Sequence, residues 1–287
     1  MPLVLRAPTQ SDIDPCGRIL YQAFHDIAVQ HGFPPDFPAV EQAVHLTSLL
    51  IGSPAFYGVV AEQDGHVVGS NFLSESDPIR GVGPIAVDPS LQGSGVGRKL
   101  MEAVIERGRG APGVRLLQDA FNSRSMSLYA SLGFDVKEPI VMIQGRPHSG
   151  AMPGWNVRPM EPSDVDECAN LCRRIHGFDR ANELRHAQPP AEPWVAVRDD
   201  RITAYATALS FWAVCHAVAE SDEDMVALLL GFAAARPEPL WFLLPTRQAS
   251  LFRWCLREGL KVIKPMTLMA MGAYQEPAGC WFPSVML

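Results

Sequence analysis

Apolar residues at helical spacing open the chain after a short strand at residues 3–5. They are Ile13, Ile19, Leu20, Phe24 and Ile27. Because Ser11-Asp12 precedes most of them as a capping pair, the pattern predicts a helix from residue 11 to about residue 30. Three prolines within residues 32–38 break that helix, and a second helix is expected at residues 39–50.

Runs rich in β-branched and aromatic residues follow at 55–61 and 66–73. The Asp64-Gly65 pair between them is a tight-turn signal, because these residue types adopt positive φ angles, so we expect an antiparallel hairpin. A further strand is expected at 81–87. Gly81, Gly83 and Pro84 interrupt it, which indicates a bulge or missing hydrogen bonds to a neighbouring strand.

A glycine-rich segment at residues 91–99 joins this strand to a helix. Three glycines in five residues weaken regular structure by roughly 0.5 to 1 kcal/mol each, but they leave backbone N–H groups bare. Those groups stand at the start of a helix, beside the positive end of its dipole, so the segment predicts an anion-binding loop. Its spacing matches neither the Walker A loop nor the dinucleotide fingerprint GxGxxG.

The helix after this loop carries one apolar stripe and ends near Gly108, and a strand is expected at 114–120. Asn122 then stands where a helix should be capped. Asn122, Ser125 and Tyr129 follow at spacings of three and four residues, which places them on one helix face. Leu132-Gly133-Phe134 ends that helix and begins a strand that reaches about residue 144.

Two of these segments resemble the GNAT superfamily of acetyl-CoA-dependent acyltransferases. Gln92-x-x-Gly95-x-Gly97 is similar to its motif A, and the series from Asn122 through Tyr129 to Gly133-Phe134 is similar to its motif B. The resemblance covers residues 3–144. It implies an α/β fold with a mixed, twisted, mostly antiparallel sheet, splayed central strands and flanking helices, in which the pantetheine arm of coenzyme A enters between the fourth and fifth strands.

The resemblance also implies acetyl-CoA as cosubstrate, no metal, and a set of coenzyme-binding residues. This set comprises Ile85, Ala86, Val87, Gln92, Gly93, Ser94, Gly95, Val96, Gly97, Arg98, Lys99, Asn122, Ser125 and Tyr129. Backbone N–H groups at 85–87 would hold the thioester carbonyl as an oxyanion hole does. Arg98 and Lys99 would neutralise coenzyme phosphates.

Acyl transfer from a thioester to an amine needs a neutral amine, a polarised carbonyl and a proton for the departing thiolate. By resemblance Tyr129 is the general acid, and its reference pKa near 10 suits a thiolate. The family's usual positions for a base fall on Gly81 and Gly83, which bind no proton. The base therefore stays open between side chains acting through water and a water chain alone; the candidate side chains are Glu75, Asp77, His25 and His31.

The opening of the chain recurs in its second half. Residues 6–16 and 158–168 share an arginine, a serine, two aspartates and a cysteine, all displaced by 152 positions. A Gly- and Pro-rich segment at 145–154 separates the halves, so we predict tandem domains at residues 1–147 and 153–287. Further matching elements are expected as a hairpin near 199–200, a helix at 222–235, a strand at 240–244 and a helix at 250–258.

The second domain is degenerate at both motifs. Where the anion-binding loop should stand, residues 220–224 contain four carboxylates and no glycine, which cap a helix well and repel a pyrophosphate. The counterpart of Tyr129 is Cys255. We therefore expect no coenzyme A binding there, and three roles stay open: covering the first domain's sheet, walling the acceptor site, or forming a homodimer.

Composition adds limits. A formal net charge of -7 argues against a nucleic-acid-binding protein. No apolar leader and no long apolar run are visible, so we expect a cytoplasmic protein without a membrane segment. The six cysteines lack a CxxC pattern and are expected as reduced core thiols. Cys168, Cys172 and His176 lie one turn apart on a helix, too extended for one metal ion.

The leading hypothesis is an N-acetyltransferase that moves an acetyl group to a primary amine of an unidentified small-molecule or peptide acceptor. Two alternatives stay open. One is a non-catalytic coenzyme A binder or sensor, favoured by the missing base. The other is a transferase of longer acyl groups, since the pocket beyond the thioester cannot be seen in the sequence. The acidic balance mildly favours a cationic acceptor.

Overall fold

The computed structural model describes residues 3–187 and 189–285. The described residues form two compact units: residues 3–116 with 121–135, and residues 117–120 with 136–285. In the described ranges, every helix is too short or too polar to cross a membrane. Each unit is described by itself below.

The first unit contains the elements that the sequence pattern predicts, with bounds close to those expected. They are β1 (Val4–Arg6), η1 (Gln10–Asp12), α1 (Ile13–Gln30), α2 (Val40–Gly52), β2 (Phe56–Gln63), β3 (His66–Ser74), β4 (Arg80–Val82), β5 (Ala86–Val87), η2 (Pro89–Leu91), α3 (Val96–Gly108), β6 (Gly113–Asp119) and α4 (Ser123–Ser131). Asp64 and Gly65, with φ angles of 55° and 79°, form the predicted turn between β2 and β3.

The sheet of the first unit has the strand order β1-β2-β3-β4-β6. Strands β1 to β4 are antiparallel to their neighbours, whereas β4 and β6 run parallel, with Arg80 opposite Val114 and Gly81 opposite Arg115. The interrupted strand is resolved as two pieces, and the second piece, β5, pairs with β3 alone. The sheet therefore splits between β5 and the carboxyl half of β6, which confirms the splayed central strands.

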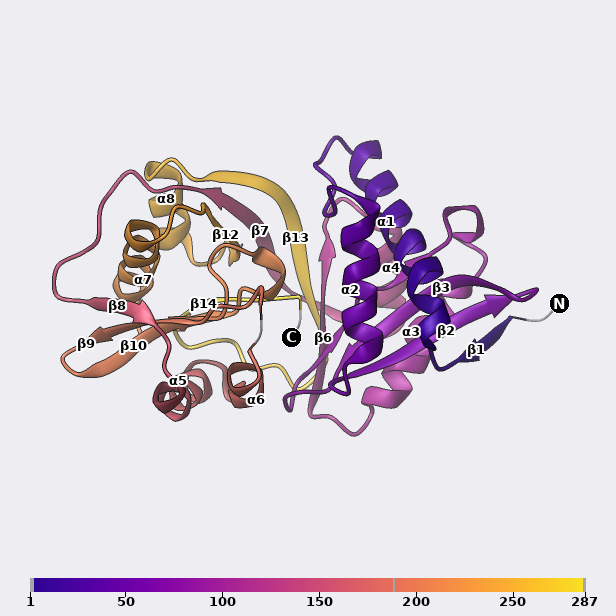
Figure 1. Ribbon diagram of the computed structural model, residues 1–287, viewed down its shortest axis with the longest axis horizontal. Coiled ribbons are helices and arrows are strands. Elements are labelled where there is room, and N and C mark those ends of the chain that lie inside the picture. Colours follow the sequence, from indigo (N-terminus) through magenta and orange to yellow (C-terminus); the bar gives the residue numbers. More distant parts are fainter. Residues whose placement is uncertain (1–2, 188, 286–287) are drawn as a thin grey trace. The chain divides into compact units, whose positions relative to one another are not determined.

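Helices cover both faces of this sheet (Figure 1). Neighbouring residues of β3 show which helix lies on which face, because successive side chains of a strand point to opposite sides. A side chain at Gly69 would meet Leu100 of α3, whereas Ser70 hydrogen-bonds Cys16 of α1. Thus α1 and α2 lie on one face, and α3, whose start packs against Leu128 of α4, lies on the other.

The second unit repeats much of this order. Its elements are β7 (Asp135–Gly145), β8 (Asn156–Pro159), η3 (Pro162–Asp164), α5 (Val165–His176), α6 (Ala181–Arg185), β9 (Trp194–Arg198), β10 (Arg201–Ala206), η4 (Trp212–Val214), β11 (Ala217–Ala219), α7 (Asp222–Ala235), β12 (Leu240–Pro245), α8 (Ala249–Arg257), β13 (Lys261–Gly272) and β14 (Cys280–Phe282). Strands β14-β11-β10-β9-β8 form a five-stranded sheet, with α7 and α5 packed against it.

Strand β7 belongs mostly to the second compact unit, although the sequence places it before the predicted domain boundary. The predicted boundary at 147–153 assigns β7 to the first domain, yet its residues from Val136 onward belong to the second compact unit. There β7 pairs antiparallel with β12, from Leu240 opposite Gly145 to Pro245 opposite Ile140. Long strand pairing of this kind is set by contacts between distant residues, so local pattern gives no sign of it.

All six cysteines are buried and free, as expected for core thiols. Cys168, Cys172 and His176 lie in the buried face of α5. Within the part of the chain that the structure describes, no group of three or more His, Cys, Asp or Glu side chains is placed to hold a metal ion.

Candidate active site

The glycine-rich loop leaves the start of α3 open. Gly93 and Gly95 have φ angles of 90° and 95°, a region that side chains disfavour, and a Cβ at either position would find no atom within 4 Å. Gly95 is the N-cap, and the backbone N–H of Lys99 donates to its carbonyl at 3.2 Å. The N–H groups before Lys99 precede that first helical bond, so the loop presents donors and the positive helix end to an anion.

Hydrogen bonds between residues of the loop itself fix its conformation and leave its outer face open. Asp88 accepts from the N–H and hydroxyl of Ser90, at 2.9 and 2.6 Å. The hydroxyl of Ser94 donates to the carbonyl of Leu91 at 2.6 Å. Val96 is buried behind the loop, where it anchors the first turn of α3. The glycines can therefore stay open to solvent without loosening the turn.

Cationic side chains flank the loop from two helices. Arg98 of α3 donates to the hydroxyl of Ser131 at 2.7 Å, and Lys99 beside it is exposed. Arg124, in the first turn of α4, donates to the side-chain oxygen of Gln92 at 3.0 Å. Sequence reasoning missed Arg124, although its position was a signal: a cation in the first turn of a helix opposes the dipole and needs another reason to be there.

Residues 85–87 lie at the split in the sheet. Ala86 and Val87 pair with Ser70 and Gly69 of β3, and β5 has no second strand partner among the described residues. Because alternate backbone groups of a strand point to its two sides, one side of this segment keeps N–H groups for a bound molecule, while the carbonyl of Val87 accepts from the side-chain amide of Gln92 at 3.4 Å. This edge faces the gap that opens beside β6.

Helix α4 is built as its motif predicts. The side chain of Asn122 caps it by accepting from the backbone N–H of Ser125 at 3.1 Å. Tyr129 is 7% exposed, and its ring lies edge-on to Phe134 with centroids 6.5 Å apart. The backbone N–H of Phe134 donates to the carbonyl of Tyr129 at 3.1 Å, and Gly133 supplies the positive φ angle that this turn needs.

The two carboxylates predicted as bases lie after β3, beside the far end of α3 from the loop. Arg107, in the last turn of α3, donates to both side-chain oxygens of Glu75, at 3.1 and 2.9 Å. Asp77 is 9% exposed, and its backbone carbonyl accepts from Arg80 at 3.2 Å. The bidentate pair orients the Glu75 carboxylate towards α3.

The two histidine candidates lie on the other face of the sheet. The ring of His25 is 3.3 Å from the carboxylate of Asp26 and 5.5 Å from the ring of Tyr21. His31, the C-cap residue that follows α1, places Nδ1 2.9 Å from the carbonyl oxygen of Ile27. Its ring lies 5.2 Å from that of Phe121.

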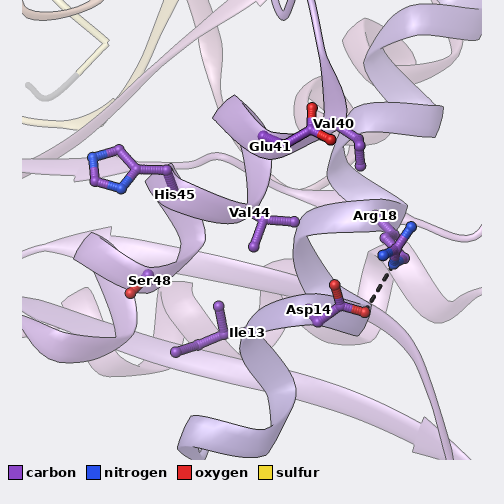
Figure 2. A pocket seen from close by; sticks show the side chains of 8 residues that line it. All are labelled: Ile13, Asp14, Arg18, Val40, Glu41, Val44, His45 and Ser48. Atoms are coloured by element: carbon purple, nitrogen blue, oxygen red, sulfur yellow. Dashed lines mark hydrogen bonds and ion pairs between the residues drawn. The ribbon is translucent and has the colours of Figure 1, made fainter.

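A surface groove of about 400 Å³ lies between α1 and α2 (Figure 2). Its lining residues are Ile13, Asp14, Arg18, Val40, Glu41, Val44, His45 and Ser48. Arg18 and Asp14 form an ion pair at its edge, at 2.8 Å. None of the residues predicted to bind coenzyme or substrate belongs to this groove.

The corresponding helix start in the second unit is filled by the chain itself. The side chain of Asp224, fully buried at the start of α7, accepts from Trp155 at 2.9 Å and from the Ser221 hydroxyl at 2.5 Å. Arg198 lies 3.4 Å from the same carboxylate, over the Trp155 ring. A protein carboxylate therefore occupies the position that an anion would take.

Comparison with known proteins agrees with this geometry. Residues 18–134 match the sequence profile of the acetyltransferase (GNAT) family. A mycothiol acetyltransferase of Thermomonospora curvata is 41% identical over 91 residues, which is 31% of each chain. Another from Thermobifida fusca is 35% identical over 98 residues, 30% of each chain. The matched segment thus spans about a third of the length of these curated relatives.

Solved structures match over nearly the whole chain. A protein of Pyrococcus horikoshii assigned as an acetyltransferase has a TM-score of 0.74 at 16% identity, with 98% of this chain and 94% of that chain covered. A tandem GNAT protein from the clavulanic acid biosynthesis pathway has a TM-score of 0.57 at 13% identity, with 96% and 100% covered. At such identities the likeness concerns the fold. Residues 18–134 therefore resemble the acetyltransferase (GNAT) family, and the chain as a whole is similar in fold to a tandem GNAT protein.

Proposed function

We propose that the first unit transfers an acetyl group from acetyl-CoA to a primary amine. The observation that carries this proposal is the open helix start at Gly93 and Gly95, where positive φ angles and empty space at both Cβ positions present N–H donors to an anion. The coenzyme carries a pyrophosphate, which such a site binds through donors and dipole together. Arg98, Lys99 and Arg124 would add positive charge around it.

The residues along β5 and α4 would then serve the chemistry. Backbone N–H groups at 85–87 hold and polarise the thioester carbonyl at the unpaired edge of β5. Tyr129 gives its proton to the departing thiolate. Asn122 and Ser125 fix the start of the helix that carries Tyr129. Acetyl-CoA supplies the acyl group; the side chains of the protein position it and move protons.

The names of the curated relatives support a small-molecule acceptor. The curated relatives are named as mycothiol acetyltransferases, which are small-molecule enzymes by that name. We propose a small-molecule amine as the acceptor for this chain too. Glu75 and Asp77 were the first candidates for recognising it or for acting as base. Arg107 forms an ion pair with Glu75 at 2.9 Å, so substitution of each carboxylate is tested separately.

One observation favours a non-catalytic coenzyme A binder. Gly81 and Gly83 occupy the strand positions where a base is expected, and glycine offers no proton acceptor. A binder would keep the loop and need neither Tyr129 nor a base. The two functions differ in whether thiol is released from acetyl-CoA when an amine is present.

Calorimetric titration with acetyl-CoA tests the proposed site. We expect one binding event per chain in the parent and none in Gly95→Glu, because the new carboxylate stands against the pyrophosphate and the helix dipole. Gly95→Ala is the matched control. Its positive φ angle costs on the order of 1 kcal/mol, so binding should weaken only several-fold.

Each result decides one part of the proposal. Failure of the parent to bind acetyl-CoA would remove the coenzyme site and the enzyme with it. Binding without thiol release across a panel of amines would favour the binder. Faster thiol release from a larger acyl thioester than from acetyl-CoA would replace acetyl by a longer acyl group.

A further inference from the structure

Three aromatic rings gather at the carboxyl end of β6 in the first unit. The Phe33 ring stacks on that of Phe121, with centroids 4.4 Å apart and an angle of 13° between planes. The His31 ring lies 5.2 Å from the same Phe121 ring. Both phenylalanines are half-buried and His31 is exposed. This ring cluster, His31, Phe33 and Phe121, therefore retains surface for a ligand.

The end of α1 holds two of these rings in fixed positions. Gly32, with φ of 73°, lets its own N–H donate to the carbonyl of Val29 at 3.1 Å, while the N–H of Phe33 reaches back to Ala28 at 2.9 Å. This pair of bonds is the Schellman motif, which ends a helix in one defined conformation. His31 and Phe33 flank Gly32, so their backbone directions are set before any ligand binds.

The hydrogen bond of His31 determines which of its ring nitrogens can accept a proton. A carbonyl oxygen only accepts hydrogen bonds, so the Nδ1 that lies 2.9 Å from the oxygen of Ile27 carries the proton. In the neutral ring Nε2 then bears the lone pair. In the described part of the chain, no acidic side chain forms an ion pair with His31, whereas His25 is paired with Asp26.

The ring cluster lies at the split in the sheet. Leu20 of α1 packs against Ala86 of β5, the strand on one side of the gap, and Phe121 lies two residues after the end of β6, the strand on the other side. The contact between Phe33 and Phe121 thus joins the α1 face to the end of the gap. The ring cluster therefore stands beyond the carboxyl end of β6, on the side of the sheet that α1 covers.

We propose that the ring cluster binds the acceptor, a primary amine on a planar or apolar skeleton, and that His31 Nε2 takes the proton from its ammonium group. This rests on the acetyl transfer proposed above. Aromatic faces attract both a flat carbon skeleton and an ammonium group. The cluster contains no carboxylate, which a polyamine or another polycation would require.

The proton balance of the step is complete. His31 Nε2 accepts one proton from the ammonium group and releases it to solvent. The amine lone pair then forms the N–C bond to the acetyl carbon while the C–S bond breaks. Tyr129 gives its proton to the thiolate, and the second proton lost by the nitrogen returns to the tyrosinate through water. One amide, one thiol and one solvent proton result.

Binding is tested first, by calorimetric titration of phenethylamine into protein saturated with coenzyme A. We expect phenethylamine to bind the parent, and Phe33→Ala to weaken it about tenfold, the loss of one aromatic contact. Phe33→Leu keeps an apolar side chain and should fall between them, and thermal unfolding of all three reports whether the fold survives. Absence of binding, equal affinity in Phe33→Ala, or tighter binding of spermidine or glucosamine would overturn the proposal.

Proton transfer is tested by the rate of thiol release with phenethylamine. His31→Gln places an amide at the level of Nε2 and removes the proton acceptor there, so kcat should fall by about 10² or more, while the affinity for acetyl-CoA stays unchanged. Added imidazole should restore part of the rate in His31→Ala. The matched control is His45→Gln, in the separate groove of Figure 2, which should behave like the parent.

The outcomes separate this inference from the function on which it rests. Lost acetyl-CoA binding in the parent removes the enzyme itself. Intact acetyl-CoA binding together with parental kcat in His31→Gln, or with no imidazole rescue of His31→Ala, removes His31 as the base and leaves the proposed coenzyme site standing.

Discussion

The two units begin alike and differ at the helix that would hold a phosphate group. Arg6 pairs with Asp12 through two hydrogen bonds of 2.7 and 2.8 Å, and Arg158 pairs with Asp164 at 2.6 and 2.9 Å. Each aspartate also accepts a backbone N–H three residues upstream, at 2.7 Å in both units. The ion pair that starts α1 is thus reproduced at the start of α5.

The two units differ at the start of the later helix, which is α3 in the first unit and α7 in the second. Gly95 opens the start of α3 with an empty Cβ position, whereas Ser221 and the buried Asp224 close the start of α7. The first arrangement offers N–H donors to an external anion, and the second satisfies them with a carboxylate of the chain. A scaffold can therefore be kept for its stability after its binding loop has changed.

The largest effect is expected at Tyr129, and Cys255, the corresponding position of the second unit, is its control. Tyr129→Phe should lower kcat about 10²-fold, because the thiolate loses its acid, with little change in acetyl-CoA affinity. Cys255→Ala, at the related position of the second unit, should leave kcat unchanged. Steady-state kinetics checks both, and full activity in Tyr129→Phe would remove its role as acid.

The next effect concerns the closed helix start. Asp224→Ala should destabilise the second unit by about 2 kcal/mol, since the half-buried Trp155 and Arg198 side chains lose their fully buried acceptor. Hydrogen exchange of residues 222–235 measures it, with exposed Glu223→Ala as control. Protection equal to that of the control would mean that α7 does not depend on this carboxylate.

A pH effect should follow from the ion pair at the start of α1. Hydrogen bonds from Arg6, and then from Thr9, lower the pKa of Asp12 to about 2 from an ordinary 3.8. Because the pKa of Asp12 is lower in the folded chain than in the unfolded chain, the ionised carboxylate stabilises the fold by about 2 kcal/mol above pH 4. This stabilisation is lost as the pH falls from 4 to 2.

Acid unfolding of Asp12→Asn checks this effect. The variant should be less stable at neutral pH and should lose the slope between pH 4 and pH 2. The pKa of Asp164 is lowered by Arg158 in the same direction, so Asp164→Asn should behave similarly in the second unit. Exposed Asp14→Asn is the control, and an unaltered acid slope in Asp12→Asn would contradict the expectation.

The smallest effect is expected at the flanking cations. Arg124→Ala should weaken acetyl-CoA binding only a few-fold, because exposed ion pairs contribute roughly 1 kcal/mol or less. The loss should shrink at high salt, since screening weakens the parent's contact. Affinity at two ionic strengths measures it. A loss that is independent of salt would assign Arg124 to holding Gln92 rather than to charge.

Local pattern predicted most elements of both units within a few residues. The hairpin turn at Asp64-Gly65 and the open helix start at Gly95 depend on φ angles that residue type sets, so they were readable from sequence. The repeat was readable as well, because one arginine-aspartate pair starts both helices. The sequence did not predict the ion pair between Arg107 and Glu75, because 32 residues separate them along the chain.

By itself the sequence determined the class of fold, the loop at 92–98, the helix that carries Tyr129 and the second unit's lack of a glycine loop. Each of these rests on neighbouring residues, whose backbone preferences and hydrogen bonds act within one or two turns. Only the tertiary structure decided that β7 pairs with β12 and that Phe33 meets Phe121. These contacts join residues far apart in the chain, and packing selects them from many arrangements that the same local pattern allows.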